Sequence, residues 1–213
     1  AYDPLPKDDT LDETRNFVDD TAFAYDQSKR DGQLTVLEFV KKGLPALIVN
    51  PTSVTGQPEN KLSLQGKAIL DIYMGKIPAM FAGGYDWVDV RDVASSICNA
   101  LTMGRVGENY LLSGKYYTMK EIVAIVSEVK GKKIRVANVP VWLVQMGLPF
   151  VKLQSLITGK APLYTNESID ILLHGNSKIS HEKARLELNH NPRPFTETIS
   201  DLIAWFKVNG YIK

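Results

Sequence analysis

The order of apolar and polar positions divides the chain into helices and short strands. After a polar opening rich in Asp, Pro and Thr, apolar residues near helical spacing predict a helix over residues 21–42, which Gly43 ends. The continuous apolar run 44–51, bounded by Gly and Pro, is typical of a strand buried on both faces. A helix, a glycine turn and a buried strand together indicate half of a βαβ unit.

The same periodicities continue to the end of the chain. Thr118 and Glu121 have the spacing of a capping box, and Gly131 is placed to end the helix that they begin. From residue 139 onwards the pattern favours helices. We expect helices over 63–74, from Asp89 or Asp92 to Gly104, and over 118–130, 141–158, 166–173, 181–188 and 197–208, and strands over 79–82, 85–90, 109–112 and 133–136.

Composition and charge narrow the class of protein. The 213 residues are 44% hydrophobic and 23% charged, and 25 basic against 24 acidic side chains leave a net charge of +1. This balance favours no nucleic-acid partner, and no apolar run approaches the roughly 18 residues of a membrane span. The single cysteine, Cys98, cannot form an internal disulfide, which indicates a reducing, cytoplasmic environment. Its apolar helical surroundings predict a buried structural thiol.

Two residues of the first predicted helix suggest chemistry. Tyr25 and Lys29 are four positions apart, so they share one helix face about one turn apart. A free phenol has a pKa of about 10, and lowering it by about three units takes roughly 4 kcal/mol, which a nearby cation helps to supply. Such a phenol exchanges a proton with a carbonyl or alcohol oxygen at neutral pH. Taken alone, the spacing favours the plainer interpretation, an exposed lysine lying along a half-buried tyrosine.

The order of segments around this pair resembles a known family. The Tyr-x-x-x-Lys helix, Gly43, the buried strand and the run Asn50-Pro51-Thr52-Ser53-Val54-Thr55-Gly56 resemble the second half of an extended short-chain dehydrogenase/reductase of the NAD-dependent epimerase/dehydratase superfamily. Later segments match in the same order, namely 87–94, 110–114, 118–122 and the C-terminal helices. Asn50-Pro51-Thr52 resembles the dihydroflavonol-reductase and 3β-hydroxysteroid-dehydrogenase branch, whereas sugar-nucleotide epimerases more often have Tyr-Gly where this chain has Thr55-Gly56.

The resemblance implies a fold, an activity and a cofactor. The fold is an incomplete Rossmann-type doubly wound α/β sheet with a smaller, mostly helical substrate domain. Residues 1–138 form the second half of the Rossmann-type domain, with segments of the substrate domain interleaved. Residues 139–213 form the helical substrate domain. The activity is that of a carbonyl reductase or alcohol dehydrogenase using NADP or NAD on a small organic substrate. Tyr25 is then the general acid/base and Lys29 binds the nicotinamide ribose. Pro51, Thr52 and Ser53 border the nicotinamide.

One part of the family pattern is missing from the sequence. No glycine-rich phosphate loop of the form Gly-x-Gly-x-x-Gly occurs, and Gly104-Arg105-Val106-Gly107 reads as a turn that ends a helix. The catalytic Ser or Thr of the family is expected at or before Ala1. We therefore expect a fragment that does not hold the dinucleotide and is inactive by itself.

Several alternatives stay open at this stage. A nucleotide-sugar epimerase or dehydratase, or a non-catalytic dinucleotide-sensing protein, fits the same fold, and the helix of Tyr25 and Lys29 is also a candidate homodimer interface. Trp87 fits either the substrate pocket or the core, and the apolar stretch 141–157 fits either a substrate cover or a segment buried against the sheet. The three histidines have no metal-ligand spacing and favour surface or capping roles.

Overall fold

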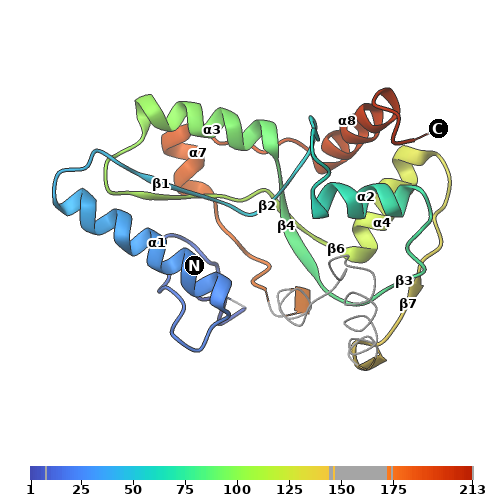
Figure 1. Cartoon of the computed structure of the whole chain (residues 1–213), viewed down its shortest axis with the longest axis horizontal. Coiled ribbons are helices and arrows are strands. Elements are labelled where there is room, and N and C mark those ends of the chain that lie inside the picture. Colours follow the sequence, from blue (N-terminus) through green and yellow to red (C-terminus); the bar gives the residue numbers. More distant parts are fainter. Residues whose placement is uncertain (8, 144–145, 147–171, 174, 213) are drawn as a thin grey trace.

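The protein is described by a computed structural model for residues 1–7, 9–143, 146, 172–173 and 175–212. Two small sheets form its centre (Figure 1). In the first, β1 (Ile48–Pro51) pairs in parallel with β5 (Asn109–Leu112). In the second, β4 (Gly84–Asp89) pairs in parallel with β2 (Ser53–Thr55) and antiparallel with β6 (Lys115–Thr118).

The chain passes twice from the first sheet to the second. Thr52 alone separates β1 from β2, and Ser113 and Gly114 alone separate β5 from β6. Both crossings occur at the carboxyl ends of the parallel strands β1 and β5, where Pro51 is paired with Leu112. The two crossings therefore lie close together. A third pair, β3 (Ala79–Met80) with β7 (Ala137–Asn138), lies apart from them (Figure 1).

Helices cover both faces of the first sheet. In Figure 1, α1 (Ala24–Lys41) lies below β1, whereas α3 (Val90–Met103) and α7 (Glu182–Leu188) lie above it. This arrangement confirms the predicted α/β class. The predicted helix 21–42 is confirmed within three residues at its start and one at its end, and Gly43 follows it with a positive φ of 101°.

The main hydrophobic core is formed by three helices against the second sheet. It joins α2 (Leu64–Tyr73), α4 (Met119–Lys130) and α8 (Phe195–Val208) around Trp87. The Trp87 ring lies 5.5 Å from the ring of Phe195 and the side chain is buried, so Trp87 is a core residue. α4 begins with the predicted capping box, and Gly131 ends it in the left-handed conformation.

Three predictions about burial are wrong. The strand of the apolar run 44–51 is not buried on both faces, because no residue of β1 is fully buried and Pro51 is exposed. Cys98 is exposed, because α3 turns Val93, Ser96 and Ala100 toward the sheet and α7 and leaves position 98 on the outer face. His190 is fully buried, and its ring nitrogens contact Ser96 Oγ at 2.7 Å and the carbonyl oxygen of Ser113 at 2.9 Å. A helical pattern predicts which residues share a face of the helix, but it does not predict which face packs against other elements.

Other elements differ from their prediction or lie outside the described residues. β2 and β6 were not expected, and the strand predicted at 133–136 is absent there, since the paired residues are Ala137 and Asn138. Gly104 ends α3 and Gly107 has a φ of 85°, which confirms a turn. The stretch 141–158 and the helix 166–173 lie mostly outside the described residues. The division at residue 139 stays a prediction.

Candidate functional site

Tyr25 and Lys29 lie together on the first turns of α1. The Lys29 Nζ atom is 5.3 Å from the centroid of the Tyr25 ring, so the two side chains converge as their spacing predicts. Tyr25 is 60% exposed and Lys29 is exposed as well. No packed core therefore covers the pair, and a ligand can reach both groups.

In the part of the chain that the structure describes, no acid neutralises the charge of Lys29. Among the described residues no carboxylate lies within 4 Å of Lys29, whereas the adjacent Arg30 is bound to Asp20 and Asp31, each at 2.8 Å. The amino group of Ala1 lies near enough to feel the charge of Lys29, and burial lowers its pKa. Lys29 is thus the cation available to a group bound beside Tyr25.

The next turn of the same helix face is tied to the end of β1. Gln33 follows Lys29 by four residues and is the only residue that α1 buries. Its Nε2 atom donates a hydrogen bond to Asn50 Oδ1 at 2.8 Å. The other two amide atoms, Gln33 Oε1 and Asn50 Nδ2, are buried and have no partner among the described residues. Sequence reasoning missed Gln33, although its spacing of four and eight residues from Lys29 and Tyr25 was a usable signal.

The predicted cofactor residues Pro51, Thr52 and Ser53 form the crossing from β1 to β2, called the β1–β2 turn below. Pro51 is exposed, whereas Thr52 and Ser53 are half-buried. This turn continues the carboxyl end of a parallel strand, which is where ligands bind in open α/β sheets. The bond between Gln33 and Asn50 links this turn to the helix of Tyr25 and Lys29.

A buried carboxylate lies behind the turn. Asp86 Oδ1 accepts a hydrogen bond from Thr52 Oγ1 at 2.6 Å and one from the Gly114 N–H at 2.8 Å. Burial raises the pKa of the Asp86 carboxyl, and these two hydrogen bonds oppose the rise. Sequence reasoning missed this residue too. An acidic residue inside an apolar strand pattern, next to Trp87, was the signal.

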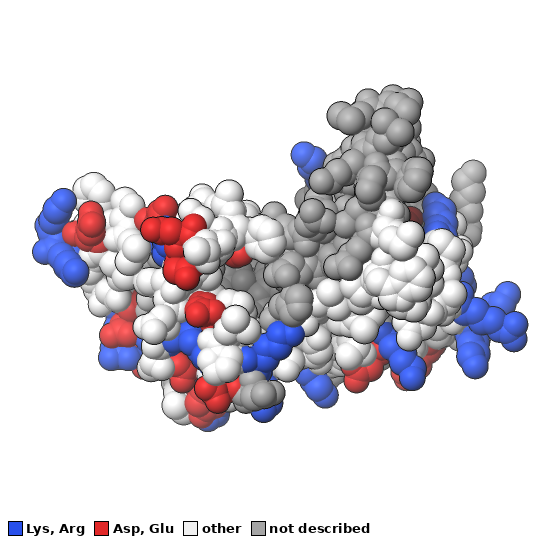
Figure 2. Space-filling view, turned by 90° about the horizontal axis from the view of Figure 1, so that it is seen from below, with Lys and Arg blue, Asp and Glu red and all other residues white. Residues whose placement is uncertain are grey.

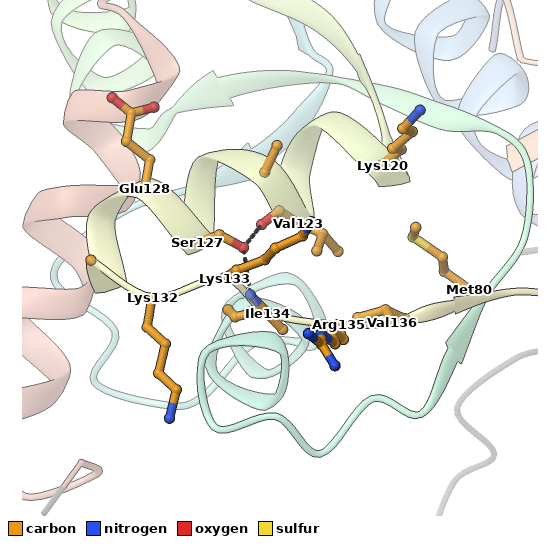
Figure 3. Close-up of a pocket in the computed structure, with 12 residues that line it drawn as sticks. Met80, Lys120, Val123, Ser127, Glu128, Lys132, Lys133, Ile134, Arg135 and Val136 are labelled. Atoms are coloured by element: carbon orange, nitrogen blue, oxygen red, sulfur yellow. Dashed lines mark hydrogen bonds between the residues drawn. The ribbon is translucent and has the colours of Figure 1, made fainter.

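The described grooves lie elsewhere. A groove of about 640 Å³ runs between α4 and residues 131–136 (Figure 3), where Ser127 Oγ accepts a hydrogen bond from the Ile134 N–H. None of the predicted site residues lines it. The face of the molecule seen in Figure 2 carries acidic and basic side chains side by side rather than a field of one sign.

The described residues offer no metal centre and no membrane span. No group of three His, Cys, Asp or Glu side chains among them is arranged to hold a metal ion. His181 and His190 instead pack edge to face, with ring centroids 5.3 Å apart. Within the described part of the chain, no helix is both long and apolar enough to cross a membrane.

Comparison with known proteins gives relatives for most of the chain. No family model matches. Sterol demethylase protein B of Methylococcus capsulatus is 29% identical over 191 residues, which are 88% of this chain and 58% of that protein. A putative dihydroflavonol 4-reductase of Synechocystis sp. is 28% identical over 200 residues, 89% of this chain and 56% of that protein. The chain thus spans little more than half the length of these relatives.

Solved structures show the same fold. The crystal structure of gox2253 has a TM-score of 0.78 and 31% identity, and the match covers 98% of this chain and 63% of that one. The dTDP-glucose 4,6-dehydratase of Bacillus anthracis, solved with NAD, has a TM-score of 0.68 and 21% identity, with 97% and 58% covered. The homologues and structural neighbours of this chain are members of the NAD-dependent epimerase/dehydratase family, which confirms the resemblance drawn from the Tyr25–Lys29 helix and the Asn50–Gly56 run.

Proposed function

We propose that the protein carrying this chain is an NAD(P)-dependent oxidoreductase of the carbonyl reductase or alcohol dehydrogenase type. It transfers hydride between NADPH or NADH and a small organic carbonyl or alcohol. The strongest support is that the exposed phenol of Tyr25 lies beside the ammonium group of Lys29. Among the described residues, no carboxylate neutralises this ammonium group. Such a pair suits proton transfer to a bound oxygen.

The residues of this chain fit a bound nicotinamide nucleoside in type and position. Lys29 is available to bind the ribose hydroxyls beside Tyr25. The β1–β2 turn, linked to the same helix through Gln33 and Asn50, borders the ring. The dinucleotide supplies the hydride. Tyr25 donates its phenolic proton to the carbonyl oxygen in reduction and takes it back in oxidation.

The test is Tyr25→Phe in the full-length protein that carries this chain. Turnover is followed as NADPH oxidation with a panel of aldehydes and ketones. Loss of a positioned general acid is expected to lower turnover by about 10²–10⁴-fold while NADPH binding is retained. Tyr211→Phe, at a partly exposed tyrosine after α8, is the matched control and is expected to keep full turnover. Unchanged turnover in Tyr25→Phe would refute the proposal.

A nucleotide-sugar epimerase or dehydratase is the second candidate. Its support is the likeness of this chain to dTDP-glucose 4,6-dehydratases, one of which, from Mycobacterium tuberculosis, is 26% identical over 123 residues. Thr55 before Gly56, where epimerases more often have Tyr, disfavours it. Binding of dTDP-glucose or UDP-glucose, measured by thermal shift, separates the two. Stabilisation by either compound favours the epimerase or dehydratase, and the absence of any stabilisation favours the carbonyl reductase or alcohol dehydrogenase.

A non-catalytic dinucleotide sensor is a third candidate of a different class. It would bind NADPH or NADH without turning over any substrate, and Tyr25→Phe would leave its biological activity intact. Retention of both Tyr25 and Lys29 in one exposed pair disfavours it, because a sensor has no need of a proton donor. The same Tyr25→Phe variant therefore tests this candidate as well.

A further inference from the structure

Asp86 occupies the point where both crossings between the two sheets meet. It lies on β4, which pairs with β2 on one side and with β6 on the other. The register places Ser53 opposite Trp87, so Thr52, one residue earlier, comes opposite Asp86. Gly114 immediately precedes β6 on the other side. One carboxylate therefore reaches the crossing from β1 to β2 and the crossing from β5 to β6.

The two hydrogen bonds end on the same oxygen of Asp86. Thr52 donates its hydroxyl proton and Gly114 its N–H, both to Oδ1. A Cβ at position 114 would overlap the carbonyl oxygen of Trp87, so only glycine allows the close approach of the two segments. The neighbouring Ser113 is fixed from its far side, since its carbonyl oxygen accepts from His190 Nε2 and its hydroxyl donates to the carbonyl of Ile179.

These contacts leave Thr52 little rotational freedom. The side chain of Thr52 is fixed by a hydrogen bond to a buried charged acceptor, which is stronger than one to a neutral acceptor. The backbone N–H of Thr52 is also used, bonding the carbonyl oxygen of Leu112 at 3.3 Å. Asp86 itself is only 7% exposed and cannot turn toward solvent without breaking both of its bonds.

We propose that Asp86 is a positioning residue, which acts through Thr52 to hold the β1–β2 turn in the one conformation that orients the nicotinamide. This inference rests on the proposed function and assigns to it a residue outside the Tyr-x-x-x-Lys helix. In this role Asp86 acts through its bonds to Thr52 and Gly114 rather than by a contact of its own with cofactor or substrate. Its effect arises because reacting groups must be held close to their productive geometry, and a displacement of about 1 Å costs up to about 10²-fold in rate.

The experiment compares matched variants of the full-length protein with NADPH as the probe. Thr52→Val removes the hydroxyl but keeps the branched shape, and Thr52→Ser keeps the hydroxyl. Asp86→Leu removes both acceptors, whereas Asp86→Asn keeps a carbonyl oxygen that can accept both bonds. Binding is followed by the fluorescence of the nicotinamide ring, which reports its surroundings, and the urea midpoint of each variant is recorded in parallel.

We expect Thr52→Val and Asp86→Leu to lose most of the increase in nicotinamide emission on binding, and about tenfold or more of turnover. Their dissociation constants for NADPH should change less than about threefold, a difference of about 0.6 kcal/mol, because neither change alters Tyr25 or Lys29. Thr52→Ser and Asp86→Asn should restore the emission. If Asp86→Leu fails to fold, the comparison of Thr52→Val with Asp86→Asn decides the test.

Two results would overturn the inference in different ways. A Thr52→Val variant with a lowered urea midpoint but unchanged emission and turnover would show that the bond to Asp86 is structural only. If the wild-type protein binds neither NADPH nor NADH, the proposed function itself fails, and this inference fails with it. If NADPH binds and Tyr25→Phe abolishes turnover, the proposed function stands whatever the Thr52 variants show.

Discussion

Gln33 and Asn50 join the helix that carries the Tyr25–Lys29 pair to the strand that leads into the β1–β2 turn. The Gln33 Nε2 atom donates to Asn50 Oδ1 at 2.8 Å, and Gln33 is the only residue of α1 that is buried. Tyr25, Lys29 and Gln33 are spaced by four residues, so all three lie along one face of the helix. One face of α1 therefore carries both the Tyr25–Lys29 pair and the hydrogen bond that attaches the helix to the sheet.

Breaking this attachment is expected to destabilise the protein. Gln33→Met should lower the free energy of unfolding by about 1–3 kcal/mol, because it leaves the buried amide of Asn50 without a partner. In a double-mutant cycle, Gln33→Met with Asn50→Leu should cost less than the sum of the single changes. Urea unfolding measures all three. Glu38→Gln, at an exposed position of the same helix, is the control, and strict additivity would contradict a direct interaction.

The two C-terminal histidines predict a dependence of stability on pH. Burial lowers the pKa of both His181 and His190. With a depressed folded-state pKa, the unfolded chain takes up protons first as pH falls below its value of about 6.5. The stability contribution is therefore complete above about pH 7.5 and decreases as the pH falls through the unfolded and then the folded pKa.

Urea midpoints measured between about pH 8 and pH 5 check this expectation. Histidine is the side chain whose ordinary pKa lies within this range. His190→Gln should flatten the profile, at the cost of a lower plateau, because its ring contacts Ser96 and Ser113. His174, outside the described residues, supplies the comparison through His174→Gln. A wild-type protein that grows more stable toward pH 5 would contradict the assigned direction.

Exposed apolar residues on and beside α1 predict a homodimer. Leu34 and Phe39 are 42% and 53% exposed on this helix, and Phe23, its N-cap residue, is 39% exposed. We expect the full-length protein to form a dimer that Phe39→Glu weakens, measured by analytical ultracentrifugation. Leu186→Glu, which alters an apolar residue that is 64% exposed on α7, should leave association unchanged. A monomer at all concentrations would refute the interface.

The 213-residue chain by itself is expected to bind NADP weakly. It contains the residues that we predict to border the nicotinamide but no Gly-x-Gly-x-x-Gly loop, and the backbone N–H groups of such a loop bind the pyrophosphate. Titration calorimetry of the isolated chain with NADP should therefore give little heat, compared with the full-length protein as the positive control. Tight binding by the isolated chain would show that its own residues bind the phosphates.

Local sequence was sufficient for the elements whose ends are set by nearby residues. The capping box of Thr118 and Glu121 and the glycine at 131 predicted α4 correctly, because their hydrogen bonds close within one helical turn. The Tyr25–Lys29 pair was likewise predictable, since helix geometry alone brings positions four apart together. The apolar run also predicted that β1 is a strand, although the strand is only partly buried.

Only the tertiary structure decided the features that need a partner far along the chain. β2 and β6 are three or four residues long, and pairing with β4 rather than their own sequence makes them strands. The exposure of Cys98 and the burial of His190 depend on where α7 packs. The contacts of Asp86 with Thr52 and Gly114 span 34 and 28 residues. Periodicity determines which side chains share a face of a helix or strand. Which face is buried and which strands pair depends on contacts between segments that are far apart in the sequence, because burial and pairing lower the free energy only when those segments meet.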